Sequence, residues 1–211
     1  MERGKFITFE GGEGCGKSTQ VRRLEAALKA EGKSVLLTRE PGGTILAEQI
    51  RHLIKDQDED APCDRSELML FLAARAQLVK HVIRPALEAG TWVISDRFSD
   101  STLAYQGYGR GLPLELIARM NDFACEGLKP DLTLLLDVSP ETALARRQGR
   151  EKQMNTSPDR IEREGNDFHE RLRQGFAALA KADPERIVTI DANGSPEEVW
   201  DLVWKSLKRI H

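Results

Sequence analysis

A glycine-rich loop near the start of the chain constrains the fold more than any other feature. Residues 11–18, GGEGCGKS, match the pattern G-x-x-x-x-G-K-[ST]. The apolar run Lys5–Glu10 before them predicts a buried strand, and apolar residues at helical spacing after them predict a helix over residues 19–31. In such a strand–loop–helix unit, backbone N–H groups converge on an anion at a helix N-terminus. The pattern predicts a nucleoside triphosphate site made by Gly11, Gly12, Glu13, Gly14, Cys15, Gly16, Lys17, Ser18 and Thr19.

Two side chains of this loop have separate predicted tasks. Lys17 would reach the β- and γ-phosphates, and the hydroxyl of Ser18 would ligate Mg²⁺. Asp96, at the end of a later apolar run, could hold a water of the Mg²⁺ shell, and Arg97 beside it could clamp a second phosphate group. A surface ion pair is the alternative interpretation of Asp96 and Arg97. The phosphate loop elsewhere in the chain favours the site.

Strand and helix patterns alternate along the rest of the chain. Further strands are predicted over residues 34–39, 91–96, 131–137 and 186–191, and helices over residues 66–89, 114–126 and 196–210. Near-continuous apolar strands separated by helices predict an α/β fold with a parallel sheet covered on both faces. We expect one domain over residues 1–211, with ligands at the carboxyl ends of the strands.

Composition limits the class of partner. With 31 Lys and Arg against 34 Asp and Glu, the net charge is −3, and no basic excess favours nucleic acid or a membrane surface. Cys15, Cys63 and Cys125 are far apart and odd in number, which favours a reduced compartment. No apolar run reaches membrane-spanning length, and the first strand leaves no room for a signal peptide. We therefore expect a cytoplasmic protein with small-molecule partners.

One segment has little capacity to form a core. Residues 146–166 are rich in charge, and Met154 and Ile161 are their only sizeable apolar side chains. A solvated surface loop and a mobile lid both fit this composition.

Five motifs occur in order along the chain: GGEG at 11–14, TREPGGT at 38–44, FLAAR at 71–75, DRF at 96–98 and AYQG at 104–107. Together they resemble the motifs of bacterial thymidylate kinases, and the similarity runs from Phe6 to about Ile190. The resemblance implies a P-loop nucleoside monophosphate kinase fold, with a five-stranded parallel sheet, an ATP site and a lid. It also implies Mg²⁺-dependent transfer of the ATP γ-phosphoryl group to dTMP, giving dTDP for dTTP synthesis, in a homodimer.

The resemblance assigns the acceptor side of the site. Glu13 matches an acidic residue that faces the deoxyribose 3′-hydroxyl and the acceptor phosphate. Phe71 and Arg75, four residues apart on one helix, lie on the same side, where the ring would stack on a pyrimidine and the guanidinium would donate to a carbonyl. From spacing alone, Phe71 would be ordinary core, and the family pattern reverses that interpretation.

Further substrate contacts follow from the same resemblance. Thr102 and Gln106 match positions that contact the base. The monophosphate and sugar candidates are Arg97, Arg39 and Arg51 for the phosphate, with Tyr105 and Tyr108 beside the sugar.

The phosphate loop contains no arginine, so the resemblance implies that the lid, about residues 146–166, supplies the catalytic one. Glu151–Pro158 looks like an insertion relative to the compact family pattern, which blurs the alignment. Four arginines are available, and we favour Arg150 and then Arg147 over Arg146 and Arg160.

Two other functions compete with this interpretation. One is a kinase for another pyrimidine nucleotide or a nucleoside, because Phe71, Arg75 and Gln106 favour a pyrimidine without excluding uridylate. The other is a noncatalytic ATP-binding module. The presence of Lys17 and Ser18 in the loop weighs against it.

Overall fold

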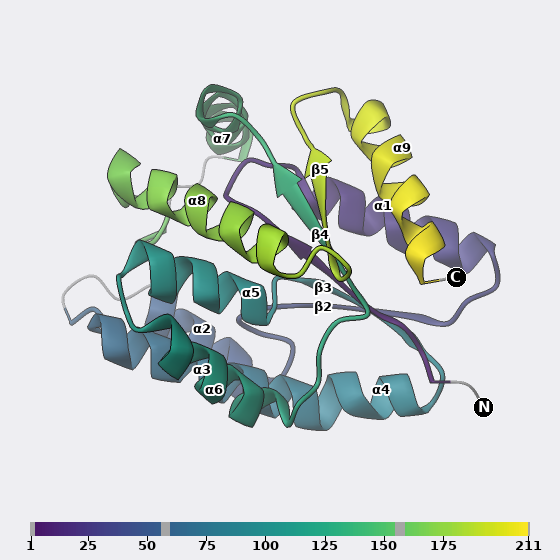
Figure 1. The fold of residues 1–211 in the computed structure, drawn as a ribbon, viewed down its shortest axis with the longest axis horizontal. Coiled ribbons are helices and arrows are strands. Elements are labelled where there is room, and N and C mark those ends of the chain that lie inside the picture. Colours follow the sequence, from purple (N-terminus) through teal and green to yellow (C-terminus); the bar gives the residue numbers. More distant parts are fainter. Residues whose placement is uncertain (1–2, 56–59, 155–158, 211) are drawn as a thin grey trace.

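A parallel sheet runs through the centre of the molecule (Figure 1). The computed structural model describes residues 3–55, 60–154 and 159–210, with the side chains of 150–154 excepted. In sheet order the strands are β2 (Val35–Arg39), β3 (Trp92–Asp96), β1 (Phe6–Glu10), β4 (Leu132–Asp137) and β5 (Ile187–Asp191). Every pairing is parallel. The predicted five-stranded parallel sheet is confirmed, with strand ends within a residue or two of those expected.

Helices cover both faces of this sheet (Figure 1). One face carries α1 (Lys17–Ala30) and α9 (Pro196–Ser206). The other carries α2 (Ile45–Lys55), α3 (Asp64–Leu78), α4 (Arg84–Glu88), α5 (Ser99–Thr102), α6 (Leu114–Cys125) and α8 (Asn166–Ala182). A π-helical segment, η1 (Val79–Ile83), joins α3 to α4, a second, η2 (Leu103–Gly109), continues α5, and a short 3₁₀ turn, η3 (Leu207–Arg209), follows α9.

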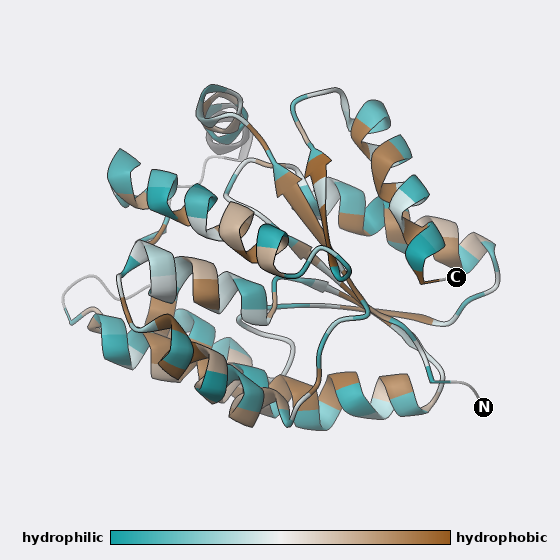
Figure 2. Cartoon of the chain, viewed as in Figure 1, coloured by the Kyte–Doolittle hydropathy of each residue, from teal (hydrophilic) through white to brown (hydrophobic). Residues whose placement is uncertain are grey.

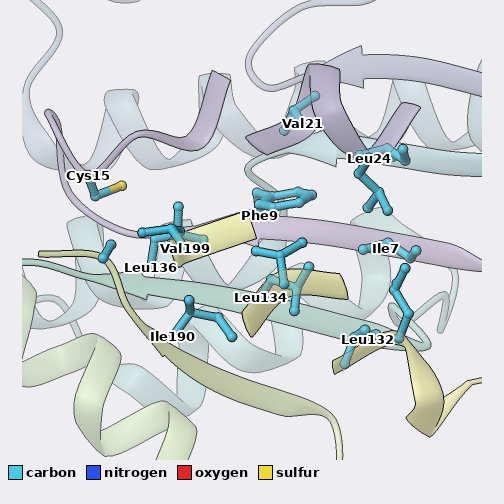
Figure 3. Close-up of a cluster of buried hydrophobic side chains, with 14 of the residues drawn as sticks. Ile7, Phe9, Cys15, Val21, Leu24, Leu132, Leu134, Leu136, Ile190 and Val199 are labelled. Atoms are coloured by element: carbon cyan, nitrogen blue, oxygen red, sulfur yellow. The ribbon is translucent and has the colours of Figure 1, made fainter. Parts of the chain in front are cut away.

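The alternation of side chains along β1 divides the core between the two faces. Ile7 and Phe9 pack against Leu24 of α1 and Leu134 of β4 (Figure 3), while Phe6 packs on the opposite face. Colouring by hydropathy shows apolar strands, with polar residues on the outer sides of the helices (Figure 2). Glu10 is fully buried on the face opposite Ile7 and Phe9. The strand that leads to the phosphate loop therefore has one apolar face and one partly polar face.

Two helices differ from the sequence-based expectation. The predicted helix over 66–89 is one continuous helical rod, but its middle turn widens into η1. The surface-loop interpretation of 146–166 is wrong for its first part, because α7 (Pro140–Met154) continues through residue 154. Ala, Leu, Arg, Gln and Lys have high helix propensity, so a charged segment without a core face can still be helical.

The strand order places β1 between β3 and β4, where the direction of chain progression through the sheet reverses. In open parallel sheets, ligands bind outside the carboxyl ends of the strands at this point. The glycine-rich loop follows β1, so it lies at the mouth of that crevice. No helix in the described ranges combines the length and the apolarity that crossing a bilayer requires.

Candidate active site

A cavity of about 1010 Å³ opens at the carboxyl ends of β1, β2 and β3. Its walls come from the glycine-rich loop, α2, α3, η2, α7 and the segment 159–162. Most of the residues predicted for the site line it together: Glu13, Gly14, Gly16, Lys17, Ser18, Thr19, Arg39, Arg51, Phe71, Arg75, Asp96, Arg97, Thr102, Tyr105, Gln106 and Arg147. The sequence motifs therefore converge on one place in the fold.

Two glycines of the glycine-rich loop are required for steric reasons. Gly14 has φ of 78°, and a Cβ there would lie 2.4 Å from the carbonyl oxygen of Ala143 in α7. Gly11 has φ of 134°, and a Cβ there would lie 2.5 Å from the carbonyl oxygen of Leu136. Cys15 is 1% exposed and belongs to the apolar cluster beneath the loop, so its side chain does not face the cavity.

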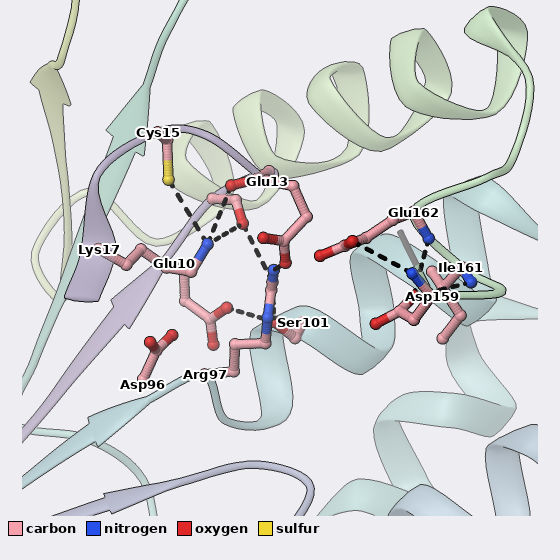
Figure 4. A network of polar contacts seen from close by, with 12 residues as sticks. Glu10, Glu13, Cys15, Lys17, Asp96, Arg97, Ser101, Asp159, Ile161 and Glu162 are labelled. Carbon is pink, nitrogen blue, oxygen red and sulfur yellow. Dashed lines mark hydrogen bonds and ion pairs between the residues drawn. The ribbon is translucent and has the colours of Figure 1, made fainter. Parts of the chain in front are cut away.

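Lys17 is folded back onto this loop. Its Nζ donates to the carbonyl oxygens of Gly11 at 3.0 Å and Gly12 at 2.9 Å, and lies 3.5 Å from Sγ of Cys15 (Figure 4). Burial and the charge of Arg97 act to lower the pKa of Lys17, but Cys15, Glu13 and Asp96 raise it by more. Lys17 therefore remains a cation at the edge of the cavity.

Glu13 and Arg97 form an ion pair across the mouth of the cavity. Nη2 of Arg97 donates to Oε1 of Glu13 at 2.6 Å, and Nη1 donates to the carbonyl oxygen of Gly11 at 3.0 Å (Figure 4). The guanidinium lies 4.9 Å from the ring centroid of Tyr105. Burial acts to raise the pKa of Glu13, but Lys17 and Arg97 hold it well below its usual range. Glu13 is therefore ionised and tied to the cation that is expected to bind phosphate.

A second carboxyl group lies beneath this pair. Glu10 is fully buried, and its two oxygens lie 2.7 Å from the backbone nitrogen of Phe98 and 2.5 Å from Oγ of Ser101. Burial, with the nearby charge of Asp100, raises the pKa of Glu10 to about 8. Oγ of Ser101 also accepts from Nη1 of Arg97 at 3.2 Å, so Glu10 is linked to the cavity through one hydroxyl.

The two residues predicted for Mg²⁺ are adjacent. Oγ of Ser18 donates to Oδ2 of Asp96 at 3.4 Å, and both residues line the cavity. A hydroxyl and a carboxylate are hard oxygen donors, and Mg²⁺ in phosphoryl-transfer sites takes few protein ligands because phosphates and water complete its shell. Across the described ranges, no three His, Cys, Asp or Glu side chains cluster as a metal cage. The Ser18–Asp96 pair fits a magnesium ion shared with a nucleotide.

Arg75 occupies the expected position but is bonded differently from our expectation. It is 1% exposed, and all five N–H groups are directed at protein acceptors. Nε and Nη2 donate to Glu40, Nη2 also donates to the carbonyl oxygen of Phe98, and Nη1 donates to Thr102 and Asn121. A contact between Arg75 and a base carbonyl would require one of these N–H groups to be shared.

The remaining predicted arginines, Arg39 and Arg51, also line the cavity. Nη2 of Arg39 donates to Glu48 at 2.8 Å, and Nη1 of Arg51 donates to the carbonyl oxygen of Pro41 at 3.0 Å. Burial and the charge of Arg39 lower the pKa of Arg51. Tyr108 does not line the cavity, and its side chain packs against Gly175 of α8. The expectation that Tyr108 lies beside the sugar is therefore not met.

The lid arginines are placed unequally. Arg147 lines the cavity, and its Nη1 donates to the carbonyl oxygen of Glu162 at 3.4 Å. Arg146 lines it too, but donates to the carbonyl oxygens of Ala192 and Gly194. Arg160 is bonded to Glu67. The side chains of Arg150 and of the apparent insertion at 151–158 lie outside the described part of the chain.

Sequence reasoning missed part of the wall. Asp159, Ile161 and Glu162 line the cavity, and Asp159 forms an ion pair with Lys55 of α2. The backbone N–H groups of Ile161 and Glu162 donate to Oδ1 of Asp159, so this turn is locally ordered. These residues belong to the charged segment 146–166, in which the sequence pattern pointed to the arginines as site residues and not to Asp159, Ile161 or Glu162.

Comparison with known proteins gives a consistent result. The family model described as thymidylate kinase matches residues 9–203. A thymidylate kinase of Synechococcus sp. strain JA-2-3B'a(2-13) is 53% identical, over 94% of this chain and 92% of its own length. That of Solidesulfovibrio magneticus is 50% identical, over 94% and 96%. The crystal structure of thymidylate kinase from Ehrlichia chaffeensis superposes with a TM-score of 0.79 at 35% identity, covering 97% of this chain and 99% of the other.

Proposed function

Because the chain belongs to the thymidylate kinase family and phosphorylates dTMP with ATP as the donor, we propose that the cavity beside the glycine-rich loop is its active site. The observation that carries this proposal is the meeting of Lys17, Arg97 and Glu13 at one end of the cavity with Phe71 and Gln106 in its wall. One end suits phosphates, and the other suits a pyrimidine.

Transfer of the γ-phosphoryl group requires no strong base, because the acceptor oxygen of dTMP is already anionic. Catalysis is then positioning together with stabilisation of spread negative charge. Lys17 leaves the carbonyls of Gly11 and Gly12 to bind the β- and γ-phosphates of ATP. Arg97 binds the acceptor phosphate, and Arg39 and Arg51 add charge on that side. Glu13 keeps Arg97 in place and faces the deoxyribose.

Ser18 and Asp96 would hold Mg²⁺ between them and the nucleotide phosphates. When bound, the ion would neutralise charge that develops on the phosphoryl oxygens. Ser18 reaches this position because it follows Lys17 in the first turn of α1, and Asp96 because it ends β3.

The base is proposed to lie against Phe71, with Thr102, Tyr105 and Gln106 around it. Arg75 reaches a pyrimidine 4-carbonyl by sharing the Nη1–H that it directs at Thr102. Arginine only donates, so the exocyclic amino group of cytosine would meet it donor to donor. This arrangement favours a thymine or uracil ring.

The lid supplies the remaining positive charge. Among the arginines with described side chains, Arg147 is the best placed, because it lines the cavity and is held through one long hydrogen bond. Arg150 lies three residues further along the same helix and remains our first choice. Either would act on charge that develops during transfer.

A homodimer is proposed through the helices on the α2, α3 and α6 side. Exposed apolar side chains gather there: Ile45, Leu46, Leu53, Met69, Leu116 and Phe123. Leu116 and Phe123 are seven residues apart and share one stripe of α6, and Phe123 is 88% exposed. A second copy of the chain would bury this stripe.

The chain is also proposed to act in the cytoplasm.

A panel of nucleoside monophosphates with ATP and Mg²⁺, scored by ADP release, tests this assignment. We expect dTMP to be the best acceptor and dUMP to be poorer by up to about 200-fold, because one methyl contact is worth roughly 1–3 kcal/mol. We expect dCMP to be essentially excluded. Efficient phosphorylation of dCMP by the unmodified protein would overturn the proposed base contacts.

A further inference from the structure

Glu67 of α3 is the centre of a buried polar cluster beside the cavity. It is 1% exposed, yet four donors converge on its carboxylate. Oε1 accepts from Nε2 of Gln106 at 2.8 Å and from Nε of Arg110 at 3.2 Å. Oε2 accepts from Nη2 of Arg110 at 3.2 Å and from Nη2 of Arg160. Glu67 itself does not line the cavity, but Gln106 does.

The charge state of Glu67 determines what it can bond. Burial acts to raise its pKa, but the hydrogen bonds from Arg110 and Gln106 lower it by more, so the pKa lies below its usual value. Glu67 is therefore ionised at neutral pH. An ionised carboxylate only accepts hydrogen bonds.

This fixes which way the Gln106 amide points. A glutamine side chain carries a carbonyl oxygen and an NH₂ group, and the two are assigned from their partners. Only the NH₂ group can face Glu67, so the carbonyl oxygen Oε1 must take the other side. We propose that Glu67 is a specificity-determining positioning residue, which holds Gln106 so that the cavity receives a hydrogen-bond acceptor and not a donor.

The consequence for substrate choice rests on the proposed contact between Gln106 and the base. Thymine and uracil carry a proton on N3, which Oε1 of Gln106 accepts. Cytosine carries a lone pair on N3, which would oppose the lone pairs of Oε1. A Gln106 free to rotate would offer its NH₂ group to cytosine, so discrimination requires a partner that prevents rotation.

The Glu67→Gln variant removes that constraint, because a neutral amide can either donate to or accept from Gln106. The measured quantity is the ratio of kcat/KM for dTMP to kcat/KM for dCMP. We expect this ratio to fall about tenfold, the size of one reversed hydrogen bond. Glu164→Gln is the matched control, since Glu164 also binds Arg110 but does not contact Gln106. In the control the ratio should stay unchanged.

Gln106→Ala, alone and combined with Glu67→Gln, separates the positioning role of Glu67 from the proposed contact of Gln106 with the base. If Glu67 acts through Gln106, each single change lowers the ratio, and the second adds nothing to the first. If Gln106→Ala lowers the ratio while Glu67→Gln leaves it intact, the positioning role is overturned and the base contact stands. If Gln106→Ala leaves the ratio intact, both the positioning role of Glu67 and the contact of Gln106 with the base are overturned.

A measurement on the unmodified protein covers the case in which Glu67→Gln does not fold. In the proposed orientation, one Nε2 proton of Gln106 is bonded to a buried carboxylate whether or not nucleotide is present. The exchange of this proton with solvent, followed by NMR and assigned with Gln106→Ala, should be slow without nucleotide. Rapid exchange of this proton in the nucleotide-free protein would overturn the inference.

Discussion

Arg97 illustrates at the scale of one residue how the site is prepared for an anion. Its φ of 73° lies in the left-handed region, which costs a residue other than glycine about 1–3 kcal/mol. The ion pair with Glu13 and the contact with the ring of Tyr105 offset this cost. If Arg97 binds the acceptor phosphate as proposed, its guanidinium is held in place before substrate arrives, and little reorganisation accompanies transfer.

Lys17 gives the first prediction at this scale. Lys17→Ala should lower kcat by at least 100-fold, because the residue neutralises phosphate charge. Circular dichroism and the unfolding temperature should change little, since among the described residues the side chain bonds the loop carbonyls and Cys15 and no other element. Lys29→Ala, at the exposed end of the same helix, is the control and should keep full activity. Near-normal activity of Lys17→Ala would contradict the assignment of the glycine-rich loop to the triphosphate.

Arg75 gives a prediction about stability. Its buried pairing with Glu40 means that Arg75→Ala leaves a carboxylate without a partner. We expect the free energy of unfolding to fall by about 3–5 kcal/mol, as measured by urea denaturation. Arg75→Met combined with Glu40→Gln should recover part of that loss. An Arg75→Ala variant as stable as the parent would contradict the buried pair.

Glu10 gives a prediction about pH. Its pKa of about 8 in the folded protein exceeds that of an unfolded carboxyl, so between pH 5 and 8 the folded state binds the extra proton. The contribution of Glu10 to stability is therefore greatest at low pH and declines as pH rises to 8, by up to about 1.4 kcal/mol per pH unit. Urea denaturation of the parent and of Glu10→Gln at several pH values measures it. A difference between them that is constant with pH would contradict the raised pKa.

At the scale of elements, α7 connects two parts of the proposed active site. Its early turns pack on the glycine-rich loop, where the carbonyl of Ala143 meets Gly14. Its later turns carry Arg147 and Arg150. Movement of α7 would therefore change the loop and the arginines together.

The lid arginines can be ranked by kinetics. Arg150→Ala should lower kcat more than it raises the KM for ATP, because an arginine that acts during transfer stabilises mainly the transition state. Arg147→Ala should show the smaller effect. Arg22→Ala, on the exposed side of α1, is the control and should behave as the parent. A full kcat with a raised KM for ATP in Arg150→Ala would indicate that Arg147, and not Arg150, is the catalytic lid arginine.

At the scale of the whole molecule, the sequence predicted the sheet better than the helices on one side of it. β1, β3 and β4 are runs of almost entirely buried residues, and β2 and β5 are short apolar runs of partial burial, so the signal is local. α2, α5 and α8 were not predicted, because their positions depend on packing against η2 and α3. The proposed contacts with the triphosphate could be predicted from one local motif, the glycine-rich loop. The pairing of Arg75 with Glu40, and of Gln106 with Glu67, joins residues about 35 to 40 positions apart, which no local pattern reports.

The assembly prediction belongs to this scale. Phe123→Glu should convert the proposed homodimer to monomer, because it places a charge in the apolar stripe of α6. Sedimentation equilibrium measures the mass. Leu202→Glu, an exposed apolar position on α9, is the control and should leave the mass unchanged. A dimer that survives Phe123→Glu would place the interface elsewhere.

The central position of β1 has a consequence for synthesis. The first strand to be made ends at Glu10, but its neighbours in the sheet begin at Trp92 and Leu132. At about 5–20 residues per second, a ribosome needs several seconds to deliver the first neighbour. During that interval, an apolar strand and a glycine-rich loop emerge without the sheet that will enclose them. The strand that anchors the glycine-rich loop therefore waits for its neighbours longer than any other described strand, and it is exposed to aggregation during that time.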